Sequence, residues 1–172
     1  MVKKNLIHKN LTVLLIILTV ISCNKTNSFD KSSRYDGEII IDNKKININA
    51  VTSFEKRKNG LSGVLPNSFN KNQGMLFVYP KSTTLSFWMI DTYFDLDIIY
   101  LDKGFKIIKI TKSLPKHPGY SNNPPIARDT PIFGQFALEL RADAILTNKL
   151  KVGDQLKWNG KKTLKELTKS AE

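Results

Sequence analysis

The chain has 172 residues, a formal net charge of +12, one cysteine and two histidines. A lone cysteine excludes a disulfide within the chain and a zinc site built from cysteines. The length is that of one domain with a substantial hydrophobic core.

The first 22 residues (1–22) have the features of a signal peptide. Lysines precede the apolar run LTVLLIILTVI (11–21), which is too short to span a bilayer comfortably. The run leads into VISC, an ending that resembles the lipobox of bacterial lipoproteins. The resemblance implies cleavage before Cys23 and a diacylglyceryl group on its thiol. An uncleaved anchor and an ordinary secreted protein are the alternatives.

Cleavage before Cys23 changes what the remaining chain can do. It removes three lysines, so the net charge falls from +12 to +9, and it removes His8, which leaves His117 as the last histidine. Neither a thiol catalyst nor a site of two histidines can then form, and we expect no metal and no cofactor. The basic charge favours anionic lipid headgroups or acidic wall polymers as partners, or simply solubility, and export disfavours nucleic acid.

The segment after the cysteine, residues 23–36, is polar and predicts a flexible tether. The folded domain is expected over residues 37–158. It begins with two predicted strands, EIIID (38–42) and KININAV (45–51), which flank turn residues Asn43 and Lys44.

A short helix is predicted next, in TSFEKRKNG (52–60). Thr52 and Glu55 have the spacing of a capping box, and Gly60 is expected to end the helix. Asp102 begins a predicted tight turn between two later strands. The strand patterns that follow the helix are GMLFVYP (74–80), TLSFWMI (84–90), LDIIYLD (96–102) and FKIIKI (105–110).

Residues 111–134 contain five prolines and predict a long loop. Loops of this length often act as lids or binding loops, and a rigid cover over one end of the domain is the alternative. Tyr120 in this loop could contact a sugar or a peptide. His117 is expected to be a solvated surface residue, because a catalytic base there would need an ordered loop and a nearby nucleophile.

The last part of the domain contains a strand pattern, a short helix pattern and a final strand pattern. These are QFALELR (135–141), ADAILTNKL (142–150) and QLKW (155–158), and a Lys-rich tail follows over residues 159–172. Many short strands with turn signals predict a mostly β fold. We expect an antiparallel β-sandwich or barrel-like single domain with one or two short helices.

Acids interrupt the apolar stretch FWMIDTYFDLDIIYLD (87–102). Asp95 and Asp97 share one strand face, about 7 Å apart at the standard rise, which is near the separation of paired carboxylates in glycoside hydrolysis. Any same-face pair has this spacing, so structural roles are favoured. Asp91 and Thr92 are expected to cap a turn by hydrogen bonds to backbone amides.

Several segments together are typical of one family: RKNGL (57–61), GMLFVYP (74–80), SFWMIDTYFDLDIIYLD (86–102), LEL (138–140) and VGD (152–154). Over most of residues 37–158 the chain resembles the domain of unknown function 192 family. The resemblance implies a compact, mostly β, sandwich-like prokaryotic domain that is often exported, and it implies no activity. Asp91 and Asp95 stand where the family commonly has Asn and Pro, which argues against a shared carboxylate mechanism.

Three charged positions match the family, namely Arg57, Asp97 and Glu139. We hypothesise that they form a buried or half-buried polar network under a groove roofed by the 111–134 loop. Alternatively, Asp97 holds a neighbouring loop or pairs with Arg57. The full set of candidate groove residues is Arg57, Asp91, Thr92, Asp97, Tyr120 and Glu139.

These features favour a cell-envelope lipoprotein that faces the periplasm or the cell exterior. Its domain would be a non-catalytic binding module for a small molecule, a glycan or an envelope protein. A hydrolase that uses Asp97 with Glu139 and a purely structural envelope protein are the alternatives. The sequence contains no nucleophile motif and no glycine-rich phosphate loop to support an enzyme.

Overall fold

A computed structural model describes residues 35–172. The predicted signal peptide (1–22), Cys23 and all but the last two residues of the predicted tether lie outside the described residues. The elements are β1 (Gly37–Ile41), β2 (Lys44–Val51), α1 (Phe54–Asn59), β3 (Gln73–Leu85), β4 (Leu96–Leu101), β5 (Ile107–Leu114), β6 (Ile132–Arg141), β7 (Trp158–Gly160) and α2 (Leu164–Lys169), with 3₁₀ turns η1 (Ala142–Ala144) and η2 (Leu146–Lys149).

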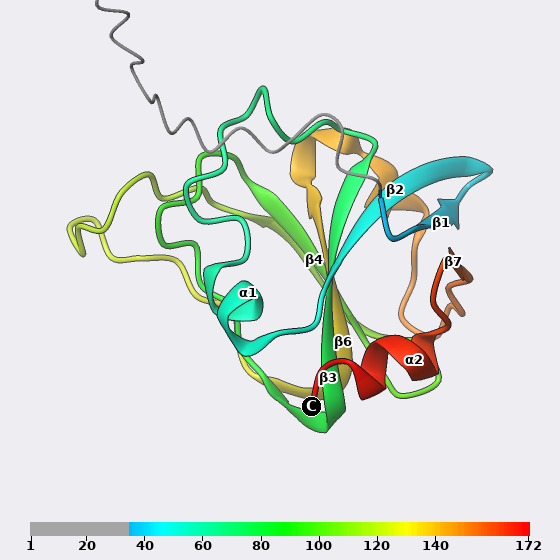
Figure 1. Cartoon of the computed structure of the whole chain (residues 1–172). Helices are drawn as coiled ribbons and strands as arrows, with labels where there is room; N and C mark the ends of the chain where they lie inside the picture. The colour runs from blue at the N-terminus through cyan, green and yellow to red at the C-terminus, as the bar shows by residue number, and fades with distance from the viewer. Residues whose placement is uncertain (1–34) are drawn as a thin grey trace, which may run out of the picture.

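The seven strands form one sheet in the order β5-β4-β6-β3-β2-β1-β7 (Figure 1). β2 and β3 pair in parallel through a crossover that contains α1, whereas the other neighbours are antiparallel. The mostly β fold with two short helices is therefore confirmed. A sandwich or closed barrel is not confirmed, because the described strands make a single open sheet whose edges are β5 and β7. Alternation within a strand reports which face is buried, and it does not report which strands are neighbours.

Both faces of the sheet are buried, and each has its own core. The α1-side core includes Phe77, Ile98 and Tyr100 and lies under the segments that connect β2 to β3 and β3 to β4. The α2-side core includes Ile99 from β4 and Leu167 from α2. Successive residues of β4 alternate between the two cores, as strand geometry requires. Figure 1 shows α1 and α2 on either side of β3.

The turn between β1 and β2 is made by Asp42 and Asn43, with φ values of 48° and 60°. The sequence placed this turn one residue later, at Asn43 and Lys44. Asp and Asn tolerate the left-handed conformation that a two-residue hairpin turn requires, whereas Lys44 continues as the first residue of β2.

The predicted helix is confirmed, with one change at its start. Ser53 is the N-cap, and its hydroxyl accepts a hydrogen bond from the Lys56 backbone amide, so Thr52 is not the cap. Gly60 ends the helix at a φ of 49°, as expected, in a conformation that side chains other than glycine rarely adopt.

The two strands predicted at 74–80 and 84–90 are one longer strand with a different end. β3 runs over 13 residues, with an irregularity in its pairing to β6 between Val78 and Thr83. Pro80 and its neighbours lie in this bulge, and in the sequence they resemble a break between two strands. Residues 86–90 leave the sheet and make only isolated bridges, one of them between Trp88 and Arg128.

The Lys-rich segment 159–172 contributes to the folded domain. It contains the last two residues of β7 and all of α2, and α2 begins with a capping box between Thr163 and Glu166. Leu167 and Ala171 are buried in the α2-side core. Within residues 35–172, no helix is long and apolar enough to cross a membrane.

Candidate functional site

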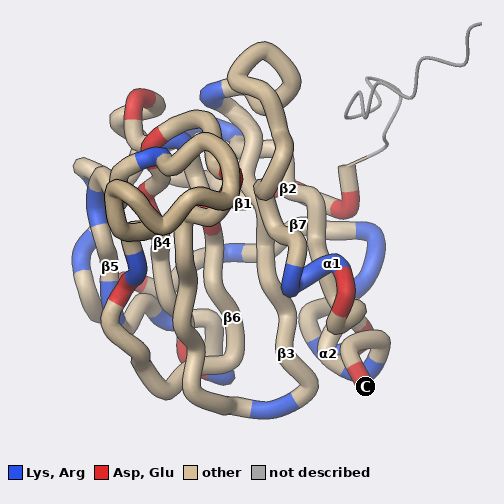
Figure 2. Tube along the Cα trace, turned by 90° about the vertical axis from the view of Figure 1, so that its left-hand side faces the viewer, with Lys and Arg blue, Asp and Glu red and all other residues tan. Residues whose placement is uncertain are grey.

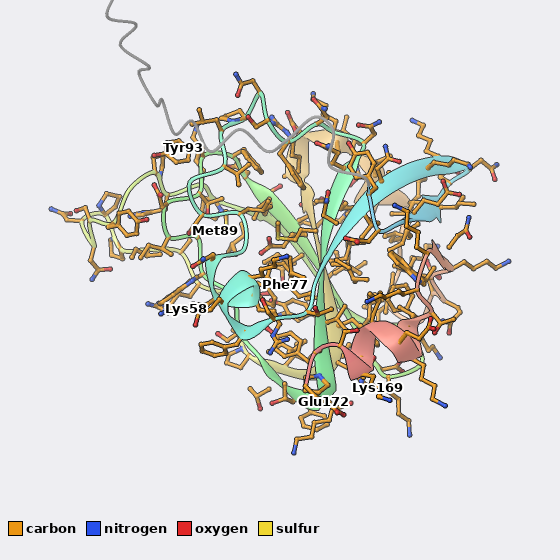
Figure 3. The ribbon with its side chains drawn as sticks, in the orientation of Figure 1. Lys58, Phe77, Met89, Tyr93, Lys169 and Glu172 are labelled. Carbon is orange, nitrogen blue, oxygen red and sulfur yellow. The ribbon has the colours of Figure 1, made fainter. Side chains whose placement is uncertain are left out.

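A cavity of about 280 Å³ lies between α1 and the α1-side face of the sheet. Its floor is made of buried side chains from three strands, and its rim is made of exposed side chains from α1 and the segment after β3. Figure 3 shows Phe77 beside α1 and Lys58 on the helix. The floor includes Phe77, Leu96 and Glu139, and the rim includes Phe54, Lys58 and Trp88.

The end of α1 is held directly against the sheet. A Cβ atom at Gly60 would lie 3.2 Å from Cζ of Phe77, so only a glycine allows this close approach without movement. The next residue, Leu61, is buried in the α1-side core. The Ser62 hydroxyl donates to the Ile90 carbonyl at 2.6 Å. These contacts fix one wall of the cavity.

Arg57 joins α1 to β3 at the cavity. Its guanidinium lies over the Tyr79 ring, 4.8 Å from the centroid, and Nη1 donates to the carbonyls of Thr52 and of Val78, the latter at 3.0 Å. Lys58 is exposed on the same helix and also lines the cavity. The basic residues of α1 are visible in Figure 2, and they give the rim a positive charge.

Glu139 is the charged group on the cavity floor. It lies on β6 between Met75 of β3 and Ile98 of β4, its partners in the sheet register. Its side chain is buried, and Oε2 has no hydrogen-bond partner. Burial raises the pKa of Glu139 to about 8, so the carboxyl group is mostly protonated at neutral pH. A carboxyl group in this state can donate a proton or a hydrogen bond to whatever enters the cavity.

The two tyrosines near Glu139 provide no charge that would stabilise its ionised form. Burial also raises the pKa of the Tyr79 phenol. Burial, together with its hydrogen bond to Asp129 at 2.7 Å, raises the pKa of the Tyr100 phenol. Both phenols therefore remain neutral wherever Glu139 titrates.

Asp97 lies on the opposite face of the sheet from Glu139. In the register of β4 with β6, Asp97 is the partner of Leu140, whereas Ile98 is the partner of Glu139. The Asp97 carboxylate accepts hydrogen bonds from the Ser113 amide, at 2.7 Å, and from the Thr147 hydroxyl.

The hypothesised network of Arg57, Asp97 and Glu139 is therefore wrong. Arg57 and Glu139 line the same cavity, whereas strand parity places Asp97 on the other face of the sheet. The alternative, that Asp97 holds a neighbouring loop, agrees with its bond to Thr147 in η2.

Asp91 and Thr92 hold together three segments near the cavity. The Asp91 carboxylate accepts from the Gly119 amide at 3.0 Å, and its carbonyl accepts from the Gly63 amide at 2.8 Å. Asp91 therefore bonds a backbone amide as expected, but that amide is 28 residues away instead of in its own turn. Thr92 is buried, lines the cavity and exchanges backbone hydrogen bonds with His117.

Tyr120 is 71% exposed and does not line the cavity. The loop that carries it spans 115–131, because β5 extends to Leu114 and β6 begins at Ile132. No residue of this loop lines the cavity, so the expectation that the loop roofs the groove is wrong.

The loop instead supports one wall of the cavity from outside. The Arg128 guanidinium stacks on the Trp88 ring, 4.8 Å from the centroid. Asp129 anchors the loop to the sheet by accepting from Lys109 Nζ at 2.7 Å and from the Thr111 hydroxyl at 2.6 Å. His117 is buried, with Nε2 2.6 Å from the Ser121 carbonyl oxygen, so the expectation of a solvated histidine is wrong.

Sequence reasoning missed the aromatic walls of the cavity. Phe87 and Trp88 lie in the strand pattern TLSFWMI (84–90), which predicts both as core residues, whereas Phe87 is buried and Trp88 is 42% exposed at the rim. Neighbouring side chains of an extended segment point to opposite sides, so Phe87 and Trp88 could have been expected to differ in burial. Among residues 35–172, no three His, Cys, Asp or Glu side chains gather where they could hold a metal ion.

The fold and the cavity define a single-sheet β domain with an acid on the floor of a partly aromatic cavity. Residues 38–158 match the DUF192 family profile, described as "Uncharacterized ACR", so the chain belongs to the DUF192 family. The family predicted from the sequence motifs is thus confirmed. No curated protein matches the chain significantly.

Two solved structures have a similar fold. One is a putative transcription regulator from Sinorhizobium meliloti 1021, with 21% identity, a TM-score of 0.54, and coverage of 70% of this chain and 90% of that chain. The other is a protein of unknown function from Novosphingobium aromaticivorans DSM 12444, with 18% identity, a TM-score of 0.53, and coverage of 70% and 82%. At these identities the likeness shows the fold alone.

Proposed function

We propose that the chain is a lipid-anchored protein of the bacterial cell envelope, and that its β domain binds a small molecule in the cavity beneath α1. The observation that carries the binding proposal is Glu139, which lines the cavity and has a buried carboxyl oxygen, Oε2, without a hydrogen-bond partner. A buried polar group without a hydrogen bond costs about 1–3 kcal/mol. A ligand that bonds to Glu139 would recover this cost.

The size of the cavity favours a small molecule over a glycan chain or a protein segment. Its volume is about 280 Å³. An apolar cavity of about 150 Å³ is enough to bind benzene. The cavity beneath α1 therefore suits a molecule of one or two rings, or an aliphatic chain of similar size.

The hydrolase alternative loses its proposed catalytic pair. Asp97 and Glu139 point to opposite faces of the sheet, so they cannot act together on one bond. The hydrogen bonds from Ser113 and Thr147 also favour a structural role for Asp97, which connects β4 to β5 and η2. A purely structural role is the remaining alternative, and it gives no reason to place an unpartnered acid beside an open cavity.

The envelope location is supported by the sequence before the domain. The apolar run at 11–21, the lipobox-like ending at Cys23 and the polar segment 23–36 are arranged as in an exported lipoprotein. A Cys23→Ser variant should lose incorporation of a labelled fatty acid and shift from the membrane fraction to the soluble fraction. Equal labelling of the variant and the natural protein would contradict lipidation at Cys23.

The binding proposal is tested by thermal unfolding of the full chain in lipid nanodiscs with a collection of one- and two-ring compounds. A ligand at about 100 times its Kd stabilises the folded protein by about 2.7 kcal/mol. Ser86→Trp should abolish this effect, because Ser86 lines the rim and a tryptophan there would fill the entrance. Thr84→Trp is the matched control, since Thr84 is exposed on β3 and does not line the cavity. Stabilisation that persists in Ser86→Trp would place binding elsewhere.

A further inference from the structure

The cavity differs in charge and polarity from its floor to its mouth, and this arrangement identifies a class of ligand. Glu139 on the floor is 5% exposed and has an oxygen without a partner. The walls are the rings of Phe77 and Phe87, of which Phe77 is 1% exposed. Arg57 and Lys58 stand at the mouth, on α1.

We propose that the cavity binds a small molecule with an ammonium group at one end, an apolar body, and an acidic group at the other end. The ammonium group would bond to Glu139, the body would lie among the aromatic rings, and the acidic group would face Arg57 and Lys58. This inference rests on the proposed function, since it assigns a ligand class to the same cavity.

An acid on the floor favours an amine over a neutral hydrogen-bonding group. If the ligand presented a neutral hydrogen-bonding group, an amide or a hydroxyl of the protein would bind it equally well. Burying either of these groups costs less free energy than burying a carboxyl group. A cation beside the buried carboxylate gains a charge-assisted hydrogen bond, which is about twice as strong as a neutral one. The aromatic walls add attraction for the same cation through their ring faces.

Positive groups at the mouth explain why the ligand needs a second, acidic end. Nη1 of Arg57 is bonded to the carbonyls of Thr52 and Val78, which fixes the guanidinium in place over Tyr79. Lys58 is exposed and has no ion pair among the described residues. A plain amine would meet these positive charges on entry, whereas a zwitterion would be attracted by them.

Binding of the ammonium group releases a proton. Burial raises the pKa of Glu139 to about 8, so near pH 7 the carboxyl group is mostly protonated. The O–H bond breaks as the ammonium group arrives, the proton passes to buffer, and the carboxylate keeps the electron pair. The other titratable or charged groups around Glu139 are Tyr79 on β3 and Tyr100 on β4, whose pKa values are raised, and Asp129, bonded to Tyr100. Arg57 and Lys58 face the same cavity from α1.

This proton linkage makes affinity depend on pH with a known sign. Only the ionised fraction of Glu139 accepts the cation, and that fraction rises from about a tenth at pH 7 to nine tenths at pH 9 when the pKa is about 8. The affinity should therefore rise about tenfold over this interval for an amine that stays protonated.

The experiment is titration calorimetry on the full chain in zwitterionic lipid nanodiscs, with empty nanodiscs as the blank. The probes are 4-(aminomethyl)benzoate, benzylamine and 4-methylbenzoate, which share one ring and differ in their charged ends. We expect 4-(aminomethyl)benzoate to bind at least tenfold more tightly than either other probe. Its binding heat should vary with the ionisation enthalpy of the buffer, which reports the released proton.

Two variants assign the ends of the probe. Glu139→Gln should remove the proton release and reduce affinity for 4-(aminomethyl)benzoate about tenfold, whereas Glu55→Gln, an exposed change on α1, should not. Lys58→Gln should reduce affinity for the same probe about threefold and leave benzylamine unweakened. Lys56→Gln is its control, because Lys56 is exposed on the same helix and does not line the cavity.

The outcomes separate the ligand class from the binding function. If 4-methylbenzoate binds as tightly as 4-(aminomethyl)benzoate, or if binding releases no proton, the amine inference is overturned while binding in the cavity stands. If none of the three probes binds at millimolar concentration while compounds of the collection stabilise the protein, the ligand class is overturned and the proposed function stands. If neither the probes nor the collection bind, both are overturned.

Discussion

The strands bury one acid on each face of the sheet, Asp97 on β4 and Glu139 on β6, and the two acids are held in opposite ways. On the α2 side, Asp97 accepts hydrogen bonds from the Ser113 amide and the Thr147 hydroxyl. On the α1 side, Glu139 has an oxygen without a partner and faces a cavity. The first arrangement stabilises the fold, whereas the second leaves a group that a ligand can complete. Burial alone therefore does not distinguish a structural acid from a functional one, but its hydrogen bonds do.

The largest expected effect that sharpens this comparison is on the pH dependence of stability. Glu139 has a folded-state pKa of about 8, well above that of a solvated glutamate, so its contribution to stability is complete at low pH and is lost as pH rises through 8. The free energy of unfolding should fall by about 3–4 kcal/mol between pH 5 and pH 8, at up to about 1.4 kcal/mol per pH unit. Urea unfolding at several pH values measures this slope.

Glu139→Gln is the variant that isolates this slope, because glutamine has the same shape and does not titrate. The difference in stability between Glu139→Gln and the natural protein should grow in the variant's favour as pH rises over this window. A difference that stays constant from pH 5 to pH 8 would mean that Glu139 is not the group with the raised pKa.

The next expected effect is on the other face of the sheet. Asp97→Ala removes the acceptor of two hydrogen bonds and leaves the Ser113 amide and the Thr147 hydroxyl without their partner. We expect a loss of about 3 kcal/mol in the free energy of unfolding, since hydrogen bonds to charged groups contribute about 1.5–3 kcal/mol each. Ligand affinity, measured at a temperature where the variant is folded, should not change.

Asp95→Ala is the matched control for Asp97→Ala. Asp95 is exposed, and its carboxylate accepts one hydrogen bond, from the Lys116 amide at 2.9 Å. Its removal should cost about 1 kcal/mol or less. A similar loss in both variants would contradict the distinction between a buried, doubly bonded acid and a surface acid.

The separation of Asp97 from Glu139 shows what the sequence could and could not reveal. Most strands were recognisable, and parity within the pattern LDIIYLD (96–102) predicts Ile98 and Tyr100 on one face, which is a core face in the structure. The register between β4 and β6 could not be predicted, because the residues that pair lie 35 to 45 positions apart in the chain. A shift of one residue in that register would have put Asp97 beside Glu139.

Local signals were more informative than long-range ones. Gly60 as the helix end and Asp102 as the start of a turn follow from their own backbone requirements, and Asp102 does accept bonds from the Gly104 and Lys106 amides. The burial of His117 depends on its pairing with Thr92, 25 residues earlier in the chain. The cavity likewise depends on a crossover that returns α1 to the sheet, which no short motif specifies.

A smaller effect on the α1 side is expected from Gly60→Ala. Alanine would be strained at a φ of 49°, and its Cβ atom would lie 3.2 Å from the Phe77 ring. We expect a loss of about 1–2 kcal/mol in stability and a weaker affinity for 4-(aminomethyl)benzoate, because α1 would move from its position over the floor. Unchanged affinity beside reduced stability would show that the position of α1 does not shape the cavity.

The smallest effect is expected on the α2 side, from Thr163→Ala. Thr163 accepts a hydrogen bond from the Glu166 amide at 3.2 Å, and the Glu166 carboxylate accepts in return from the Thr163 amide at 2.7 Å. Losing this capping box should lower the free energy of unfolding by about 1 kcal/mol. The loss should affect the whole domain, because Leu167 packs the helix against the α2-side core. Urea unfolding gives this value, and calorimetry on the same protein should give an unchanged ligand affinity. Weakened binding in Thr163→Ala would mean that the two faces are coupled through the sheet, in which case stability and ligand binding are not separately assigned to them.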